Sequence, residues 1–382
     1  MKPVPFVKIF LFLVLVLSSA CGSNNSPPNI LQLPQELALD STNNRLFVVD
    51  SRNNNFSLVS TIDNSIVTGA PLLNNDSALR FAEDPQDIAV QDMGSGLSRI
   101  FIIGNGASNS NQITVLDYDS SNGLRAASFS PISVGTTSTD ELGGFALDSV
   151  NHRLFVSNST QSTLHAFSTQ DGNPSLSSPL TVASLPARLS FNSEISRLFV
   201  SSLGSNSVSV VNTADLSTAV ESLDVGGHTS ALSSFTNTSG SILAALIPGA
   251  NTIRLFHLNL TTISSSSNIG DPILPNTTGV DLPPNAPLSG AAAQLKSGET
   301  SDGTIVVFIT QSTGDLGTID ISSDLSSYST GRISVPNASA ASGLEILNDA
   351  SGFGTRVYEA APNGSTVSIV DIASRAFSSQ VF

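Results

Sequence analysis

The sequence predicts an all-β fold that is built from a repeated unit of short strands. Three observations predict it. A pattern of apolar runs and polar turns recurs along the chain, the runs are rich in Val, Ile, Leu and Phe and are bounded by Gly, Asn, Asp and Ser, and no stretch beyond the N-terminal leader shows a sustained helical period. Runs and turn residues of this kind are typical of antiparallel strands joined by hairpins.

The recurring unit is clearest in three segments that align residue by residue. Leu37–Val48 reads LALDSTNNRLFV, Phe145–Val156 reads FALDSVNHRLFV and Leu189–Val200 reads LSFNSEISRLFV. A fourth copy, Ile88–Ile102, carries three extra residues in its turn. Because a fixed-period unit indicates a repeat architecture, this pattern decides the fold.

Weaker copies complete the series. Their second apolar runs lie at 241–246, 304–309 and 356–358. A third run follows every second run, and these begin at Phe56, Ile113, Thr163, Val208, Ile253, Leu316 and Val367. Fourth runs are visible at 180–183 and 223–225. The chain therefore holds seven copies.

Four short antiparallel strands cannot bury both faces of their sheet alone. Stacking seven such sheets radially buries the faces and leaves short edges, which predicts a single seven-bladed β-propeller over residues 30–382. The spacing of Arg45, Arg99, Arg153 and Arg197 gives blades of roughly forty to fifty-five residues, in or just above the propeller range. An open β-solenoid or a pair of sandwiches is the structural alternative.

The residues of the unit also resemble a known family. Arg153–Asn158 (RLFVSN), Val208–Thr213 (VSVVNT) and Asp224–Gly227 (DVGG) are similar to the YVTN-type β-propeller repeat, with Phe in place of Tyr. The resemblance covers most of residues 30–382. It implies the fold far more than an activity, because the motif specifies how blades pack.

The N-terminus reads as a leader outside the fold. Lys2 and Lys8 are followed by an apolar run, and residues 18–20 are small, which predicts a signal peptide over residues 1–20. Cys21, the only cysteine, comes next, and this arrangement resembles a bacterial lipoprotein signal. The resemblance implies acylation of Cys21, palmitate included, and a lipid anchor at the cell envelope. A plain secretory signal is the alternative.

Residues 21–29 contain the lipidated Cys21 and a flexible tether, whose Gly, Ser, Asn and Pro composition cannot form a core. Gly22 rather than Asp follows the cysteine, so we expect the outer membrane, on its periplasmic or surface face. Residues 30–33 could form a strand that closes the ring against the last blade.

Composition limits the partners. The formal net charge is −15 and becomes −17 when Lys2 and Lys8 leave with the leader. This charge excludes a nucleic-acid partner, because phosphate binding needs a basic surface. We expect a monomer, bound to the membrane through its lipid and to an unknown protein or glycan. With one cysteine, the chain forms no internal disulfide.

The candidate site is the mouth of the central channel. The innermost strand of each blade lines the channel of a propeller, and the residues just before those strands include Glu36, Asp87 and Arg188. Two carboxylates and one arginine would therefore converge. The other blades place small residues there: Gly144, Ser230, Gly290 and Gly343. The alternative is that the three charged side chains are solvated rim residues.

Two functions remain open from the sequence. The first is a lipid-anchored cell-envelope propeller that acts as a non-catalytic binding or assembly module without cofactor. The second is a propeller hydrolase of the lactonase type, with a divalent cation at Glu36 and Asp87. No nucleophile elbow, P-loop, calcium loop or histidine pair at metal-ligand spacing is present. We therefore identify no catalytic residue.

Overall fold

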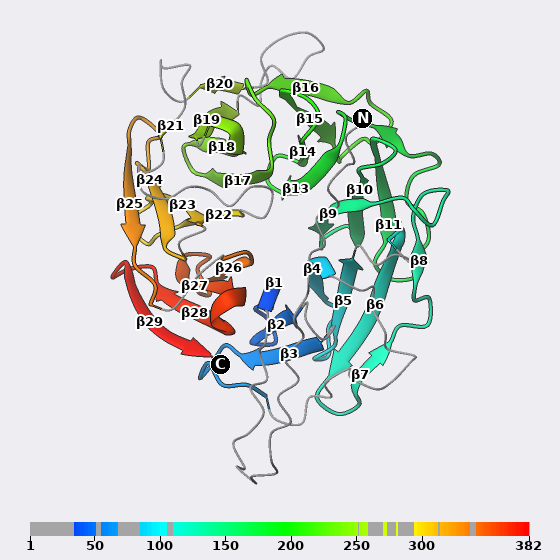
Figure 1. The fold of residues 1–382 in the computed structure, drawn as a ribbon, viewed down its shortest axis with the longest axis horizontal. Helices are drawn as coiled ribbons and strands as arrows, with labels where there is room; N and C mark the ends of the chain where they lie inside the picture. The colour runs from blue at the N-terminus through cyan, green and yellow to red at the C-terminus, as the bar shows by residue number, and fades with distance from the viewer. Residues whose placement is uncertain are drawn as a thin grey trace, which may run out of the picture.

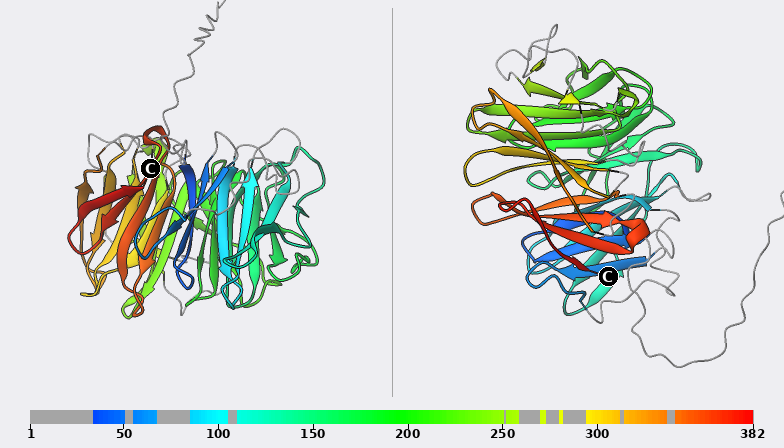
Figure 2. Two further views of the ribbon diagram at one scale, coloured as in Figure 1. Left: turned by 90° about the horizontal axis from the view of Figure 1, so that it is seen from below. Right: turned by 60° about the vertical axis from the view of Figure 1, so that its left-hand side comes forward.

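The computed structural model describes residues 34–50, 55–67, 85–104, 110–250, 252–258, 270–272, 280–281, 294–311, 314–336 and 341–381. These residues form seven antiparallel sheets arranged as blades around a central channel (Figure 1). Seen from the side, most of the visible strands run roughly along the ring axis (Figure 2). The seven-bladed, all-β prediction is confirmed.

Each blade is formed by one continuous part of the chain. The first three blades are β1 (Pro34–Asp40), β2 (Arg45–Asp50) and β3 (Asn55–Ser60); β4 (Pro85–Asp92), β5 (Ser98–Gly104), β6 (Gln112–Asp119), β7 (Gly123–Ala126) and β8 (Ile132–Ser133); and β9 (Leu142–Asp148), β10 (Arg153–Asn158), β11 (Thr163–Ser168) and β12 (Leu180–Thr181). The predicted runs of these blades coincide with their strands.

The last four blades follow the same order from the channel outward. They are β13 (Pro186–Asn192), β14 (Arg197–Ser202), β15 (Ser207–Asn212) and β16 (Glu221–Asp224); β17 (Ala231–Asn237), β18 (Gly240–Ile247), β19 (Thr252–Leu258), β20 (Gly270–Pro272) and β21 (Val280–Asp281); β22 (Leu295–Glu299), β23 (Ile305–Thr310), β24 (Leu316–Ile321) and β25 (Tyr328–Ile333); and β26 (Leu344–Asn348), β27 (Gly354–Ala361), β28 (Thr366–Asp371) and β29 (Ala376–Val381). Short 3-10 helices lie at Pro248–Ala250 and Pro362–Gly364. Within the described part of the chain, no helix has the length and hydropathy of a membrane span.

The last residue of the turn has the same backbone conformation in the three clear copies of the repeat. Asn44, His152 and Ser196 each precede the repeat arginine and each have a positive φ of 54°, 51° and 52°. Asparagine tolerates this conformation better than most residues, whereas β-branched residues do not. His152 is thus a turn residue, and its Nδ1 lies 2.8 Å from Gln91 Nε2.

The core is divided among the interfaces between blades. The described residues form seven clusters of buried apolar side chains, one between each pair of neighbouring blades. The phenylalanine of the RLFV run enters an interface: Phe47 packs with Ile100 and Ile102 of the second blade. Burial of apolar area between sheets therefore holds the ring together.

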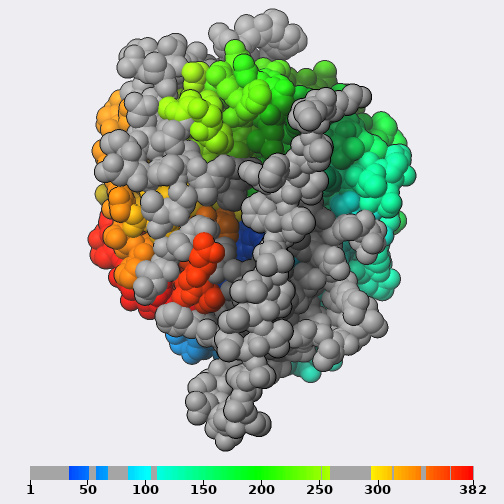
Figure 3. All heavy atoms as spheres, in the orientation of Figure 1, coloured from blue at the N-terminus to red at the C-terminus, as the bar shows by residue number. Residues whose placement is uncertain are grey.

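The ring closes between the first and last blades, which lie side by side in Figures 1 and 3. Among the described strands, no sheet contains both an N-terminal and a C-terminal strand. Residues 30–33, the predicted closing strand, lie outside the described residues. Closure among the described residues uses side chains: Tyr358 packs with Leu46, and Arg356 Nη1 donates to the Thr61 carbonyl oxygen at 2.9 Å.

The seventh blade buries one carboxyl group at an apolar position. Glu359 in β27 stands three residues after Arg356, where the clear copies of the repeat have Val48, Val156 and Val200. Its side chain is fully buried, and neither oxygen has a hydrogen-bond partner among the described residues. Burial first, and then the charge of Asp315, raise the pKa of Glu359 to about 8.

This carboxyl group predicts a pH-dependent stability. The folded protein holds the proton up to about pH 8, whereas the unfolded chain releases it near 4.5. The contribution of Glu359 to the free energy of unfolding should therefore fall as pH rises between these values, by about 1.4 kcal/mol for each pH unit. Urea unfolding of Glu359→Val from pH 4.5 to 8.5 should show a shallower fall than the wild type. The exposed Glu194→Val is the control, and an unchanged slope in Glu359→Val would refute this account.

Candidate functional site in the central channel

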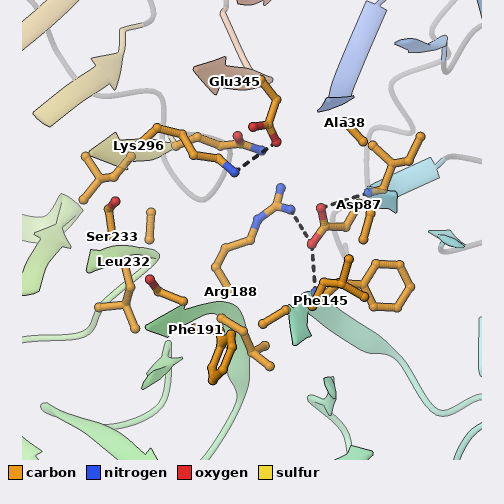
Figure 4. Close-up of a pocket in the computed structure, with 18 of the residues that line it drawn as sticks. Ala38, Asp87, Phe145, Arg188, Phe191, Leu232, Ser233, Lys296 and Glu345 are labelled. Carbon is orange, nitrogen blue, oxygen red and sulfur yellow. Dashed lines mark hydrogen bonds and ion pairs between the residues drawn. The ribbon is translucent and has the colours of Figure 1, made fainter. Parts of the chain in front are cut away.

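A cavity of about 350 Å³ occupies the channel and is lined by the innermost strands of all seven blades. The titratable side chains around it are Glu36, Asp87, Arg188, Lys296 and Glu345. They come from β1, β4, β13, β22 and β26. Figure 4 shows four of them labelled, with the heads of Arg188 and Lys296 directed toward the middle of the channel.

The structure brings together the three residues that the sequence singled out. Arg188 Nη2 lies 2.6 Å from Glu36 Oε1, and Arg188 Nη1 lies 3.1 Å from Asp87 Oδ2. One guanidinium of the fourth blade therefore joins carboxylates of the first and second blades. All three residues lie within their strands rather than just before them, which corrects the predicted placement. Their role in ligand binding stays a prediction.

The glycine of the third blade leaves room for this contact. A Cβ atom at Gly144 would lie 3.1 Å from Asp87 Oδ2 and 3.3 Å from the Cα of Arg188. At 3.1 Å, a side chain at this position would crowd the carboxylate. Of the other small residues predicted at the mouth, Gly343 lies directly before β26, Ser230 directly before β17, and Gly290 lies outside the described residues.

Further hydrogen bonds extend the contact around the ring. Gln294 Nε2 donates to Glu36 Oε2, and Gln294 Oε1 accepts from the Leu344 N–H at 3.1 Å. The Phe145 N–H donates to Asp87 Oδ2 at 2.9 Å. The network thus includes every blade except the fifth.

Burial and the neighbouring opposite charges shift the pKa values of Glu36 and Arg188 in opposite directions. Burial raises the pKa of Glu36 to about 7, although Arg188 favours the ionised form. Burial lowers the pKa of Arg188, but Glu36 and Asp87 outweigh it and raise the value overall. Arg188 is therefore a permanent cation, while Glu36 changes its charge near neutral pH.

Sequence reasoning missed a second ion pair. Lys296 Nζ lies 3.0 Å from Glu345 Oε1, and the Lys296 side chain is 41% exposed. In the sixth and seventh blades, which are weak copies of the repeat, the sequence predicts Gly290 and Gly343 at the mouth and does not single out the charged residues further along the chain. One signal was available: Lys296 is the only lysine after Lys8.

The residues do not fit a divalent cation as they are arranged. Arg188 bonds both carboxylates and already supplies the positive charge between them. The amide oxygen of Gln294 is also occupied, by a backbone N–H. No three His, Cys, Asp or Glu side chains gather as metal ligands in the described ranges, whereas calcium takes six to eight oxygen ligands.

Comparison with known proteins identifies the fold alone. No protein-family model matches the chain, and no curated protein matches its sequence. Among solved structures, hydrazine synthase of Kuenenia stuttgartiensis is 12% identical with a TM-score of 0.55, over 93% of this chain and 99% of that chain. Dihydro-heme d1 dehydrogenase NirN is 12% identical with a TM-score of 0.54, over 91% of this chain and 66% of that chain. This chain is similar to both as a β-propeller.

Removing the central cation should destabilise the ring. Arg188→Met leaves Glu36 and Asp87 buried without their partner, which costs about 3–5 kcal/mol at buried pairs. Arg125→Met removes the cation of the Arg125–Asp119 pair, whose arginine is 42% exposed, and should cost much less because solvent screens an exposed pair. Urea unfolding at pH 7 measures both, and equal losses would show that the channel contact contributes no more than a surface pair.

Proposed function

We propose that this protein is a lipid-anchored β-propeller of the bacterial cell envelope that acts as a non-catalytic binding module through its central channel. One observation supports it above the others. Every titratable side chain that lines the cavity forms an ion pair, so none is held free as a general base, while the cavity itself offers space and polar groups to a ligand.

The anchor follows from the N-terminal sequence. A leader ending at residue 20 and Cys21 directly after it resemble a lipoprotein signal. Cys21 lies outside the described residues. Stable anchoring takes more than one acyl chain, which a lipidated N-terminal cysteine provides. We place the protein at the outer membrane as a monomer whose ring binds a protein, a glycan or a small molecule.

The lactonase-type hydrolase is the weaker candidate. It is favoured by the convergence of Glu36 and Asp87 on a single group, but it requires Arg188 to leave that position. The binding module needs no such rearrangement.

The anchor predicts a labelling result. In a bacterial host supplied with labelled palmitate, the wild-type chain should incorporate the label and sediment with membranes, because the lipoprotein signal implies a diacylglyceryl group on the Cys21 sulfur. Cys21→Ser should lose both the label and the sedimentation, whereas Ser23→Ala should keep them. Label that persists in Cys21→Ser would refute the anchor.

The two candidates also differ in their response to cations. A ligand that binds only the native state raises the melting temperature. Because Arg188 holds both carboxylates, Ca²⁺, Mg²⁺, Mn²⁺ and Zn²⁺ should produce no saturable rise in the full-length protein. A saturable rise that EDTA reverses, and that Glu36→Gln/Asp87→Asn removes, would instead support the hydrolase.

A further inference from the structure

The strands that carry the acidic and the basic side chains occupy different sectors of the channel, although the charged groups themselves meet in ion pairs. The carboxylates Glu36, Asp87 and Glu345 come from the first, second and seventh blades, which are neighbours. The cations Arg188 and Lys296 come from the fourth and sixth blades. The fifth blade lies between the cations, and its innermost strand lines the cavity with uncharged residues only, 231–234. Figure 4 shows Ser233 and Leu232 in this sector.

The two cations have donors to spare, whereas the carboxylates of the Arg188 network do not have free oxygens. Lys296 carries three N–H groups and Arg188 carries five. Within the described residues, Lys296 bonds one carboxylate, and Arg188 uses its two terminal nitrogens on Glu36 and Asp87. Both oxygens of Glu36 and both oxygens of Asp87 already accept N–H groups. The open hydrogen-bonding capacity is therefore cationic.

Of the two cations, Lys296 is the more accessible. Its side chain lines the cavity and is 41% exposed, compared with 17% for Arg188, 19% for its partner Glu345 and 4% for Glu36. The ammonium group can therefore accept a second anionic partner without leaving Glu345. An anion in the sector of the fifth blade would also meet Ser233, which lines the same wall, whereas the Ser234 hydroxyl lies 2.9 Å from the Ser190 hydroxyl.

We propose that the channel binds a small organic acid by a single carboxylate, held between Arg188 and Lys296 over β17. This inference rests on the proposed function, because it specifies the ligand of the same channel. A carboxylate matches the guanidinium and ammonium donors in charge and geometry. The nearby carboxylates of Asp87 and Glu345, and of Glu36 where it is ionised, repel a doubly charged phosphate more than a singly charged ligand, and a cavity of about 350 Å³ accommodates a small metabolite.

Lys296 provides a direct reporter because it is the only lysine after Lys8. Full-length protein is treated with an amine-acylating ester, and peptide mass spectrometry follows the rate of modification at Lys296. Lactate should slow that rate saturably, by roughly tenfold at about ten times its Kd. Sodium chloride at the same ionic strength should not, because screening alone does not occupy the site.

A thermal-shift titration with lactate gives the second readout. The melting temperature of the wild type and of Arg125→Met should rise saturably, and the rise should be lost in Lys296→Met. Acetate and succinate test the tolerance of the site in the same assay, and inorganic phosphate tests the class of anion.

Three results would overturn the inference. No acid of the panel protects Lys296 or shifts the melting temperature; Lys296→Met keeps the full shift; or phosphate protects as well as the organic acids do. Membrane attachment through Cys21 is measured independently, so a failure here with the anchor intact rejects the ligand class and leaves the proposed function standing. Loss of the anchor with Lys296 protection retained would reject the lipid anchor of the proposed function and leave the ligand class standing.

Discussion

The structure depends on how the ring of seven sheets is closed. Among the described residues, no sheet contains strands from both the first and the last blade, so these two blades are joined without a shared strand. A propeller is open to solvent along one seam unless the first and last blades hold each other. Here the apolar contact of Tyr358 with Leu46 and the bond from Arg356 to Thr61 join them within the buried interface between the two blades. The channel network joins them again near the axis, where Gln294 bonds both Glu36 and the start of β26.

This arrangement makes the candidate site part of the scaffold. Arg188 reaches across the channel to the first two blades, so it fixes their spacing as well as the charge at the centre. Buried ion pairs often return little net stability, because desolvation offsets the attraction between the charges. The network is therefore better explained by the geometry it imposes than by stability alone. Lys296 differs from the residues that Arg188 holds together, because its side chain is more exposed.

Several of the polar and charged side chains of the channel lie where the chain departs from the repeat pattern. The clear copies supply apolar interfaces and turn residues with positive φ, and they differ from each other in the turn and at the channel. The weak sixth and seventh copies supply Gln294, Lys296 and Glu345 to the site, and Glu359 to an otherwise apolar position. Packing constrains the positions shared by all blades, whereas positions facing the channel can vary without disrupting an interface.

The sequence by itself determined the strands, the number of blades and the convergence of Glu36, Asp87 and Arg188. It could do so because alternating apolar runs and turns are local signals, and because a closed ring brings equivalent positions of well-aligned repeats to one axis. Only the tertiary structure decided that Arg188 lies between the two carboxylates, that Gln294, Lys296 and Glu345 join them, and that Glu359 is buried with no hydrogen-bond partner among the described residues. These features depend on side-chain directions across the channel and between blades. Several of the residues lie in repeats that diverge from the clear copies, and no local pattern in the chain encodes the distances between them.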